Sequence, residues 1–296
     1  MADIPALKVN DQITAENGAA AYRIIRSLGK GGVGRVYLAE DLGGTGEAGA
    51  GEQVVLKVPL QWDYTYDVVQ EARYLLPLVE QQPKHVAMVK NVRYGFARND
   101  PLAVPYLVMD AYVTSMAAHL QDVRSVDRGT ALRWTRQIAL GLQTTKLLHR
   151  DLKPENILLD AKLDAYVSDF GLAIPANPYT RKKNGYPAAT GLMGTAAYMS
   201  PEQIAEAESI DHRSDIYALG LLLYEMMVGA TAHPRKTASQ SADDYLDHLL
   251  DYQVTWKDVP DKAIAQIVQR STVKFRSDRY PDYWILLQDI EEAMKA

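Results

Sequence analysis

The stretch His149–Asn156 reads His-Arg-Asp-Leu-Lys-Pro-Glu-Asn, and Asp169-Phe170-Gly171 follows at short range. Together they place carboxylates, an ammonium group and an amide in one loop and in the hairpin after it. Such groups can steer a hydroxyl, neutralise phosphate and hold a divalent metal ion, which are the tasks of phosphoryl transfer. The alternative interpretation is a charged surface turn. The order and density of the groups favour the chemical interpretation.

The composition excludes several functional classes. With 296 residues and 47% hydrophobic residues, the chain can form one large domain or two lobes. A net charge of -5 gives no electrostatic case for a nucleic-acid partner or an anionic membrane. The absence of cysteine excludes disulfides, thiol catalysis and thiolate metal sites. Neither a signal peptide nor a membrane span is recognisable, so we expect a cytoplasmic protein.

Short β-type patterns come first along the chain, and helical patterns follow. Residues 1–19 are polar and small, and we expect a flexible leader there. Apolar periodicity predicts an amphipathic helix around residues 68–79, which must end or kink near Leu76 because Pro77 lies inside it. The other expected elements are strands at 22–25, 35–39, 53–58, 88–92 and 106–109, then helices through 134–142 and 216–228. This order predicts a small β-rich lobe and a larger α-helical lobe.

The stretch Gly29–Val36 fits the pattern G-x-G-x-x-G-x-V, with glycines at positions 29, 31, 32 and 34. Missing side chains let backbone N–H groups approach phosphate oxygens closely. A dinucleotide-binding fold would place a helix directly after the glycines. A β-type run follows here instead, which favours a glycine-rich hairpin over a nucleotide-binding helix turn.

These ordered motifs resemble those of the eukaryotic-type (Hanks-type) serine/threonine protein kinase catalytic domain. The form of the motifs and the short leader favour a bacterial member. The resemblance covers residues 20–292 and implies an α+β, two-lobed fold with the active site in the cleft. It implies a leader over residues 1–19, an N-lobe over 20–109, a hinge over 110–113 and a C-lobe over 114–296. Lys153 matches the serine/threonine branch rather than the tyrosine kinases.

The resemblance also implies roles for single residues. Lys57 would hold the α- and β-phosphates of ATP and pair with Glu71; a lysine that reaches water and a solvated acid are the alternatives. Asp151 would orient the attacking hydroxyl, and Lys153 would neutralise the transferring phosphoryl group. Asn156 and Asp169 would hold the metal ion. The implied ATP-binding residues are Gly29, Gly31, Gly32, Gly34, Val36, Val55, Lys57, Met109, Asp110, Tyr112, Leu158 and Asp169.

The stretch Gly194–Glu202 resembles the segment that docks the peptide substrate in this family. The resemblance implies that Glu202 pairs with Arg279 and that Asp215 braces the catalytic loop. The polar segment before it is either a solvated loop or an activation loop that phosphorylation orders through Arg150. Its candidate phosphorylation sites are Thr190 first and Thr180 second, whereas Thr195 is expected to hydrogen-bond Asp151 and Lys153.

Three features depart from the family pattern: Val55 replaces an alanine, Pro77 interrupts a helix, and the turn before His149 is short. None removes a chemical group. The implied activity is transfer of the γ-phosphate of ATP to protein serine or threonine hydroxyls. Mg²⁺, or Mn²⁺ in its place, would be the cofactor, and a transient homodimer would phosphorylate its own activation loop. Two alternatives stay open: a pseudokinase scaffold, and a small-molecule phosphotransferase, which would lack the docking segment.

Overall fold

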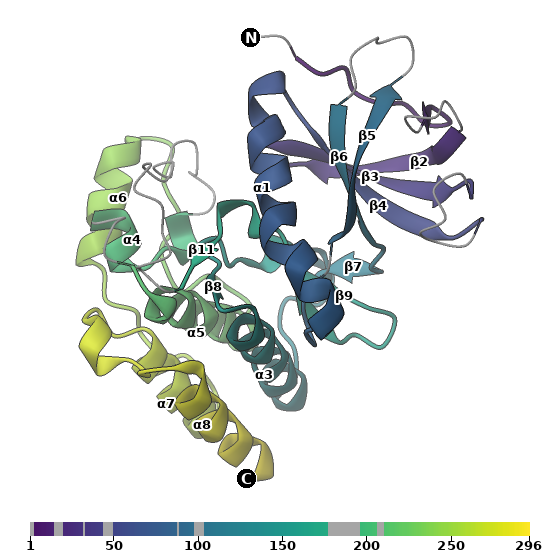
Figure 1. Cartoon of the computed structure of the whole chain (residues 1–296). Helices are drawn as coiled ribbons and strands as arrows, with labels where there is room; N and C mark the ends of the chain where they lie inside the picture. Colours follow the sequence, from purple (N-terminus) through teal and green to yellow (C-terminus); the bar gives the residue numbers. More distant parts are fainter. Residues whose placement is uncertain are drawn as a thin grey trace. The chain divides into compact units, whose positions relative to one another are not determined.

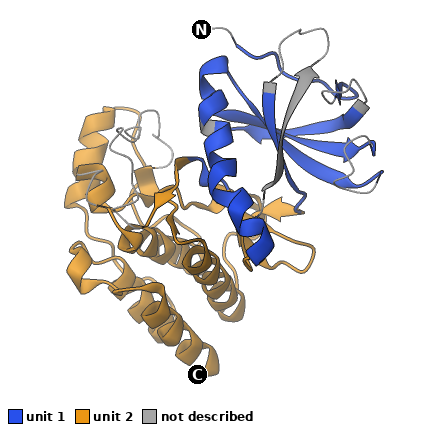
Figure 2. Ribbon diagram, viewed as in Figure 1, with its two compact units in different colours: residues 1–82, 87–112, 169–171 blue, residues 83–86, 113–168, 172–296 orange. Residues whose placement is uncertain are grey.

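The computed structural model describes residues 3–14, 20–31, 33–43, 50–87, 89–97, 104–176, 196–205 and 210–296. The chain divides into two compact units, coloured separately in Figure 2. Unit 1 consists of residues 1–82, 87–112 and 169–171, and unit 2 of residues 83–86, 113–168 and 172–296. The first is rich in strands and the second in helices, which confirms the predicted two-lobed α+β class. The change from unit 1 to unit 2 after Tyr112 falls within the predicted hinge.

The strands of unit 1 close into a barrel in the order β1-β2-β3-β4-β6-β5, all of whose neighbours are antiparallel (Figure 1). Alternate side chains of a strand point to opposite faces, so one set fills the barrel interior. That interior holds Tyr22, Ile24, Tyr37, Val54, Leu56, Tyr106 and Val108, all nearly fully buried. The strands are β1 (Gln12–Thr14), β2 (Ala20–Lys30), β3 (Gly34–Asp41), β4 (Gln53–Pro59), β5 (Val89–Ala97) and β6 (Val104–Asp110).

The beginning of the chain differs from the flexible leader predicted over residues 1–19. Strand β1 pairs with both β2 and β5 and thereby closes the barrel. Ile4 and Ile13 are 1% and 3% exposed and belong to the barrel core. The backbone N–H of Ile4 also donates to the carbonyl of Leu60. The two isoleucines are too widely spaced among polar residues to give a periodic signal, so only the tertiary structure explains this strand.

Helix α1 (Thr65–Leu75) packs against β4, β5 and β6 of the same unit. Its buried face contains Val68, Ala72 and Leu75, which confirms the predicted helical spacing. The α-helix ends before Pro77 and continues as a 3₁₀ turn, η2 (Leu76–Gln81), as the proline predicts.

Unit 2 is built around α5 (His212–Val228), whose residues are buried on nearly all sides. Helix α3 (Arg128–Thr145) packs on α5 and α8, and α7 packs on α5 and α8 as well. Aspartate or serine side chains accept backbone N–H groups at the start of most of these helices, which fixes where they begin. The other helices are α2 (Met116–Val123), α4 (Pro201–Ala205), α6 (Ala242–Asp251), α7 (Lys262–Ser271) and α8 (Tyr283–Lys295).

Short strands of unit 2 flank residues 149–156. β9 (Ile157–Leu159) pairs with β10 (Ala165–Val167) and with β7 (Thr114–Ser115). β8 (Leu147–Leu148) pairs with β11 (Ile174–Pro175). Residues 149–156 therefore run between two strands that are each held by a partner. These short strand pairs fix both ends of the loop, although neither belongs to a long sheet.

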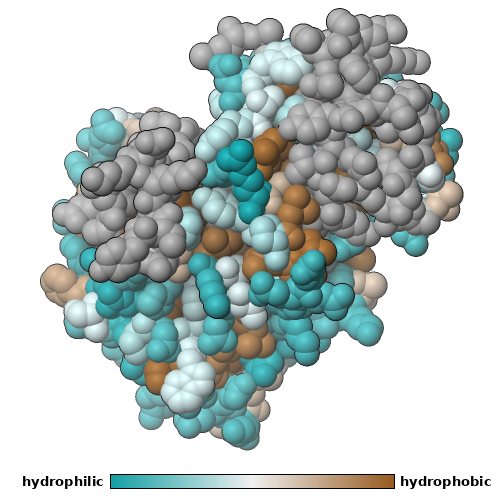
Figure 3. Space-filling model, in the orientation of Figure 1, coloured by the Kyte–Doolittle hydropathy of each residue, from teal (hydrophilic) through white to brown (hydrophobic). Residues whose placement is uncertain are grey.

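On the face in Figure 3, hydrophilic residues are mixed with smaller hydrophobic areas over the helices of unit 2. No helix within the described ranges combines the length and apolar character needed to cross a membrane.

Candidate active site

The loop that contains Asp151 is fixed to helix α5 by Asp215. The carboxylate of Asp215 accepts the backbone N–H groups of His149 at 2.8 Å and of Arg150 at 2.9 Å. Burial raises the pKa of Asp215, and these two hydrogen bonds oppose that rise. Arg150 has a φ of +70°, a left-handed conformation that is rare for a residue with a side chain. The predicted brace is thus a pair of backbone hydrogen bonds that hold a strained turn.

His149 fixes the other side of the loop. The N–H of Asp151 donates to Nδ1 of His149 at 3.3 Å, so Nδ1 is an acceptor. The ring therefore carries its proton on Nε2, which donates to the carbonyl of Ser168 at 2.9 Å. His149 is fully buried and ties the loop to the chain just before Asp169.

The carboxylate of Asp151 is engaged on one oxygen. Oδ2 accepts Nζ of Lys153 at 2.8 Å and Nδ2 of Asn156 at 3.0 Å. Nδ2 of Asn156 also donates to the backbone carbonyl of Asp151 at 2.8 Å. Oδ1 is buried and has no hydrogen-bond partner among the described residues. A buried carboxylate oxygen without a donor is costly, so a donor is expected at this position. Thr195, the predicted partner of Asp151, lies outside the described residues.

Unit 1 carries a second charged group, centred on Lys57 of β4. Its Nζ lies 2.7 Å from Oε2 of Glu71 on α1 and 2.7 Å from Oδ1 of Asp169. Burial alone would lower the pKa of Lys57, but the charges of Asp169 and Glu71 raise it above its usual value. Burial raises the pKa of Glu71, and the ammonium group of Lys57 opposes this effect. Lys57 is therefore a buried, protonated cation, not a lysine that reaches water.

Glu71 also connects this cation to the start of the Asp169-Phe170-Gly171 motif. Its second oxygen, Oε1, accepts the backbone N–H of Phe170 at 3.1 Å. Phe170 is fully buried, and Asp169 adopts a left-handed φ of +62°. The predicted Lys57–Glu71 pair is present, and Asp169 joins it.

The glycine-rich stretch forms a β-hairpin between β2 and β3, without a helix after it. The N–H of Gly31 donates to the carbonyl of Gly34 at 2.8 Å across the turn. A side chain at Gly34 would lie 3.1 Å from the carbonyl of Val58 and 3.2 Å from Cγ of Lys57. Glycine at this position thus lets β3 approach β4 beside the lysine. Gly32 lies outside the described residues.

The remaining predicted nucleotide-binding residues are divided between the units. Val36 and Val55 lie on β3 and β4, Met109 and Asp110 end β6, and Val55 pairs with Met109. Tyr112 closes unit 1, whereas Leu158 belongs to β9 of unit 2.

Asn156 and Asp169, the predicted metal ligands, have chemistry that suits a hard cation. The two hydrogen bonds from the Asn156 side chain to Asp151 both use its nitrogen, and its carbonyl oxygen takes part in neither. The Asp169 side chain is 42% exposed, so its carboxylate reaches the surface. Mg²⁺ prefers such oxygen ligands together with phosphate oxygens. Each of the two residues thus offers an oxygen of the kind that this ion prefers.

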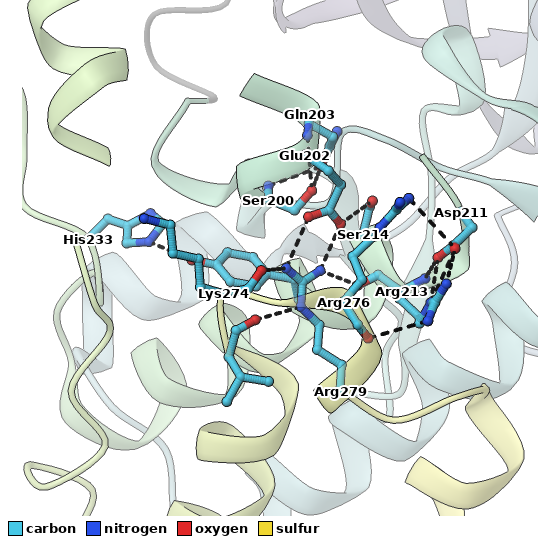
Figure 4. Close-up of polar contacts among 12 residues, drawn as sticks. Ser200, Glu202, Gln203, Asp211, Arg213, Ser214, His233, Lys274, Arg276 and Arg279 are labelled. Carbon is cyan, nitrogen blue, oxygen red and sulfur yellow. Dashed lines mark hydrogen bonds and ion pairs between the residues drawn. The ribbon is translucent and has the colours of Figure 1, made fainter. Parts of the chain in front are cut away.

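The Glu202–Arg279 pair predicted from the docking segment is present and buried (Figure 4). The guanidinium of Arg279 binds both carboxylate oxygens of Glu202, at 2.7 Å and 3.0 Å. Burial would raise the pKa of Glu202, but Arg279 holds it below its usual value. Ser214 adds a hydrogen bond of 2.6 Å to the same carboxylate. Thr180, Thr190 and Thr195 lie outside the described residues.

Two further side-chain contacts of unit 2 were not predicted from the sequence. Tyr198 donates to Glu225 at 2.6 Å, and Tyr217 and His233 are hydrogen-bonded at 2.9 Å. His233 stands in an irregular loop after α5, where no periodicity or motif distinguishes it from a surface histidine. The apolar run of α5 could have indicated burial for Tyr217, but not its partner.

Comparison with known proteins agrees with this geometry. The family model "Protein kinase domain" matches residues 22–280, so the chain belongs to this family. It is 27% identical to the serine/threonine-protein kinase PrkC of Bacillus subtilis over 93% of this chain and 41% of that protein. It is 31% identical to serine/threonine-protein kinase A of Synechocystis sp. over 71% of this chain and 41% of that protein. The chain thus spans about two fifths of the length of these relatives.

Proposed function

We propose that this chain is a serine/threonine protein kinase domain that transfers the γ-phosphate of ATP to serine or threonine hydroxyls of proteins. The main support for the proposal is that only one oxygen of the Asp151 carboxylate accepts hydrogen bonds from the described residues. Lys153 and Asn156 hold Oδ2, while Oδ1 has no partner among the described residues. A substrate hydroxyl is the donor that this oxygen would accept.

The transfer step assigns a task to each group. The hydroxyl oxygen bonds to the γ-phosphorus, the bond from phosphorus to the bridging oxygen breaks, and ADP leaves. The hydroxyl proton passes to Oδ1 of Asp151, and Lys153 offsets charge on the transferring phosphoryl group. Lys57, oriented by Glu71, would bind the α- and β-phosphates. Bound Mg²⁺ or Mn²⁺ would neutralise phosphate charge, with Asn156 and Asp169 as its protein ligands.

The proposal extends to the predicted control of the domain. Phosphorylation of Thr190, or else Thr180, would order the activation segment through Arg150. A transient homodimer, in which one copy phosphorylates the other, would deliver this phosphate. A cytoplasmic location, where ATP is available, stays a prediction alongside it.

The test compares the wild-type chain with Asp151→Asn, using γ-³²P-ATP and myelin basic protein. Loss of a general base typically lowers a rate by about 10²–10⁴-fold, and we expect a decrease of that order. Because Asp151 does not belong to the Lys57 group, ATP affinity measured by calorimetry should change little. Asp243→Asn, an exposed residue in the first turn of α6, is the matched control and should retain full activity.

Equal labelling by wild type and Asp151→Asn would contradict the proposal. ATP binding without any transfer by the wild-type chain would instead favour the pseudokinase scaffold. Transfer to a small molecule but never to protein would favour the small-molecule phosphotransferase.

A further inference from the structure

His233 is a buried histidine for which the proposed chemistry has no use. It lies in the loop after α5 and is 2% exposed. Burial of a polar ring is costly unless both nitrogens find partners. Here Nδ1 lies 2.9 Å from the backbone carbonyl of Ala197, and Nε2 lies 2.9 Å from the hydroxyl of Tyr217. The rings of Tyr217 and Tyr252 flank the imidazole.

The partners of His233 determine which nitrogen carries the proton. Burial lowers the pKa of His233 to about 4, so the ring is neutral at pH 7. A carbonyl can only accept a hydrogen bond, so Nδ1 must donate to Ala197. Nε2 is then the acceptor, and the hydroxyl of Tyr217 donates to it. Burial raises the pKa of Tyr217, which therefore keeps the proton that it donates.

A cation–π contact links Tyr217 to the Glu202–Arg279 pair. The guanidinium carbon of Arg279 lies 4.6 Å from the centre of the Tyr217 ring. Arg279 in turn binds Glu202 through both carboxylate oxygens. Contacts thus run from Glu202 through Arg279, Tyr217 and His233 to Ala197. They hold Ala197 and Glu202, which lie near the two ends of residues 196–202, the described part of the predicted docking segment.

Other contacts of this segment hold its side chains. Ala196 and Met199 pack against Tyr245 and Leu249 of α6, and Tyr198 donates to Glu225. His233 instead holds the backbone carbonyl of Ala197, and elsewhere in the segment the backbone N–H of Ser200 donates to Oε1 of Gln203 at 3.2 Å. A change at His233 would therefore shift the main chain against which a peptide would lie.

We propose that His233 is a positioning residue that fixes the main chain of the peptide-docking segment through Ala197 and thereby sets the affinity for protein substrates, but not for ATP. The inference rests on the proposed kinase function. It assigns no contact between His233 and the reacting atoms.

The kinetic test uses His233→Phe, which keeps a buried ring but removes both hydrogen bonds. The KM for myelin basic protein should rise about tenfold, because the carbonyl of Ala197 and the buried hydroxyl of Tyr217 lose their partners. The KM for ATP should stay within about twofold, since Lys57 and its partners are untouched. A purely structural role would lower kcat through loss of folded protein and leave both KM values unchanged.

Two further variants test the two hydrogen bonds of His233 separately. In His233→Asn the amide nitrogen can take the place of Nδ1 and donate to Ala197, so the KM for the protein substrate should return most of the way to wild type. Tyr217→Phe removes the donor to Nε2 and should give an intermediate rise. Tyr224→Phe, on the same helix but bonded to Asp258, is the matched control and should leave both KM values unchanged.

A spectroscopic measurement tests the contact without any activity. Long-range ¹H–¹⁵N spectra of the wild-type chain should show His233 protonated on Nδ1, with no titration between pH 5.5 and 8. The signal is assigned by its absence in His233→Asn. Protonation on Nε2, titration near the ordinary histidine pKa, or an unchanged protein-substrate KM in an active His233→Phe would overturn the inference. A wild-type chain that transfers no phosphate would contradict the proposed function instead, while the spectra would still decide whether the contact exists.

Discussion

Two residues of the sequence motifs adopt a left-handed backbone conformation, which is unfavourable for a residue that has a side chain. Arg150 and Asp169 have φ values of +70° and +62°. Such positions cost roughly 1–3 kcal/mol each and persist only where the surroundings impose them. Asp215 imposes the first through two backbone hydrogen bonds, and Lys57 holds the carboxylate of the second. Strain is thus located in the two motifs to which the proposed function assigns phosphate transfer.

His233 should make the stability of the chain sensitive to mild acid. Its pKa of about 4 in the folded state lies below the ordinary value of 6.5, so the unfolded chain binds more protons between these values. Folding stability is therefore complete above about pH 6.5 and decreases as the pH falls toward 4. We expect about 2 kcal/mol of this loss between pH 7 and pH 5. Urea unfolding at both pH values should show it in the wild type and not in His233→Phe. A pH dependence common to both proteins would assign it to other groups.

Removal of one charge of the Glu202–Arg279 pair should lower the free energy of unfolding more than replacement of both residues by apolar ones. The Arg279 side chain is fully buried, so Glu202→Gln leaves a guanidinium without its counter-charge. Removal of one partner of a buried pair typically costs about 3–5 kcal/mol. Glu202→Leu combined with Arg279→Met removes both charges and should be less destabilising than Glu202→Gln alone. Urea unfolding of the three proteins measures both effects. A double variant less stable than Glu202→Gln would show that the pair itself is strongly stabilising.

At the scale of elements, the contact between α5 and α7 depends on a missing side chain. A Cβ atom at Gly220 would lie 2.5 Å from Cβ of Ser271 and 2.9 Å from Cγ2 of Thr272. Alanine is intrinsically better than glycine inside a helix by about 1 kcal/mol. Overpacking in a core typically costs about 1–3 kcal/mol, so the clash should prevail and Gly220→Ala should lower the free energy of unfolding.

The compensating variant Ser271→Gly separates the clash from helix propensity. It removes the Cβ atom that Gly220→Ala would meet, so the double variant should regain part of the lost stability. The hydroxyl of Ser271 has no hydrogen-bond partner within the described part of the chain, so its loss adds no broken bond. Thermal unfolding of the two single variants and the double variant gives the comparison. Strictly additive losses would show that α7 yields and that the distance between the helices is adjustable.

The elements differ in how well the sequence predicts them. Helix α5 follows from a long apolar run, and the end of α1 follows from Pro77. The strands β7 to β11 have two or three residues each, too few to show alternation. Strand β1 is equally short and exists because β2 and β5 offer it hydrogen-bond partners. Local patterns predict long elements, whereas short strands depend on the tertiary structure around them.

At the scale of the whole molecule, each unit holds a different group of motif residues. Unit 1 brings Lys57, Glu71 and Asp169 together, and unit 2 joins Asp151, Lys153 and Asn156. These residues could be predicted from the sequence because each belongs to a motif with a distinctive spacing. His233 could not be named in this way, since its partners Ala197 and Tyr217 lie 36 and 16 positions away and carry no recognisable pattern.

Because each unit has its own core, we expect them to lose structure separately when a core is weakened. Ile4 lies in the barrel of unit 1 and Ile290 on α8 of unit 2, and both are at most 1% exposed. Replacement of a buried isoleucine by alanine costs about 2–5 kcal/mol. Hydrogen exchange followed by mass spectrometry should show faster exchange in β2, β3 and β4 for Ile4→Ala, and in α3, α7 and α8 for Ile290→Ala. Faster exchange throughout the chain in either variant would mean that the units unfold together. Unchanged exchange in Ile4→Ala would mean that Ile4 contributes nothing to the stability of the barrel, despite its burial and its backbone hydrogen bond to Leu60.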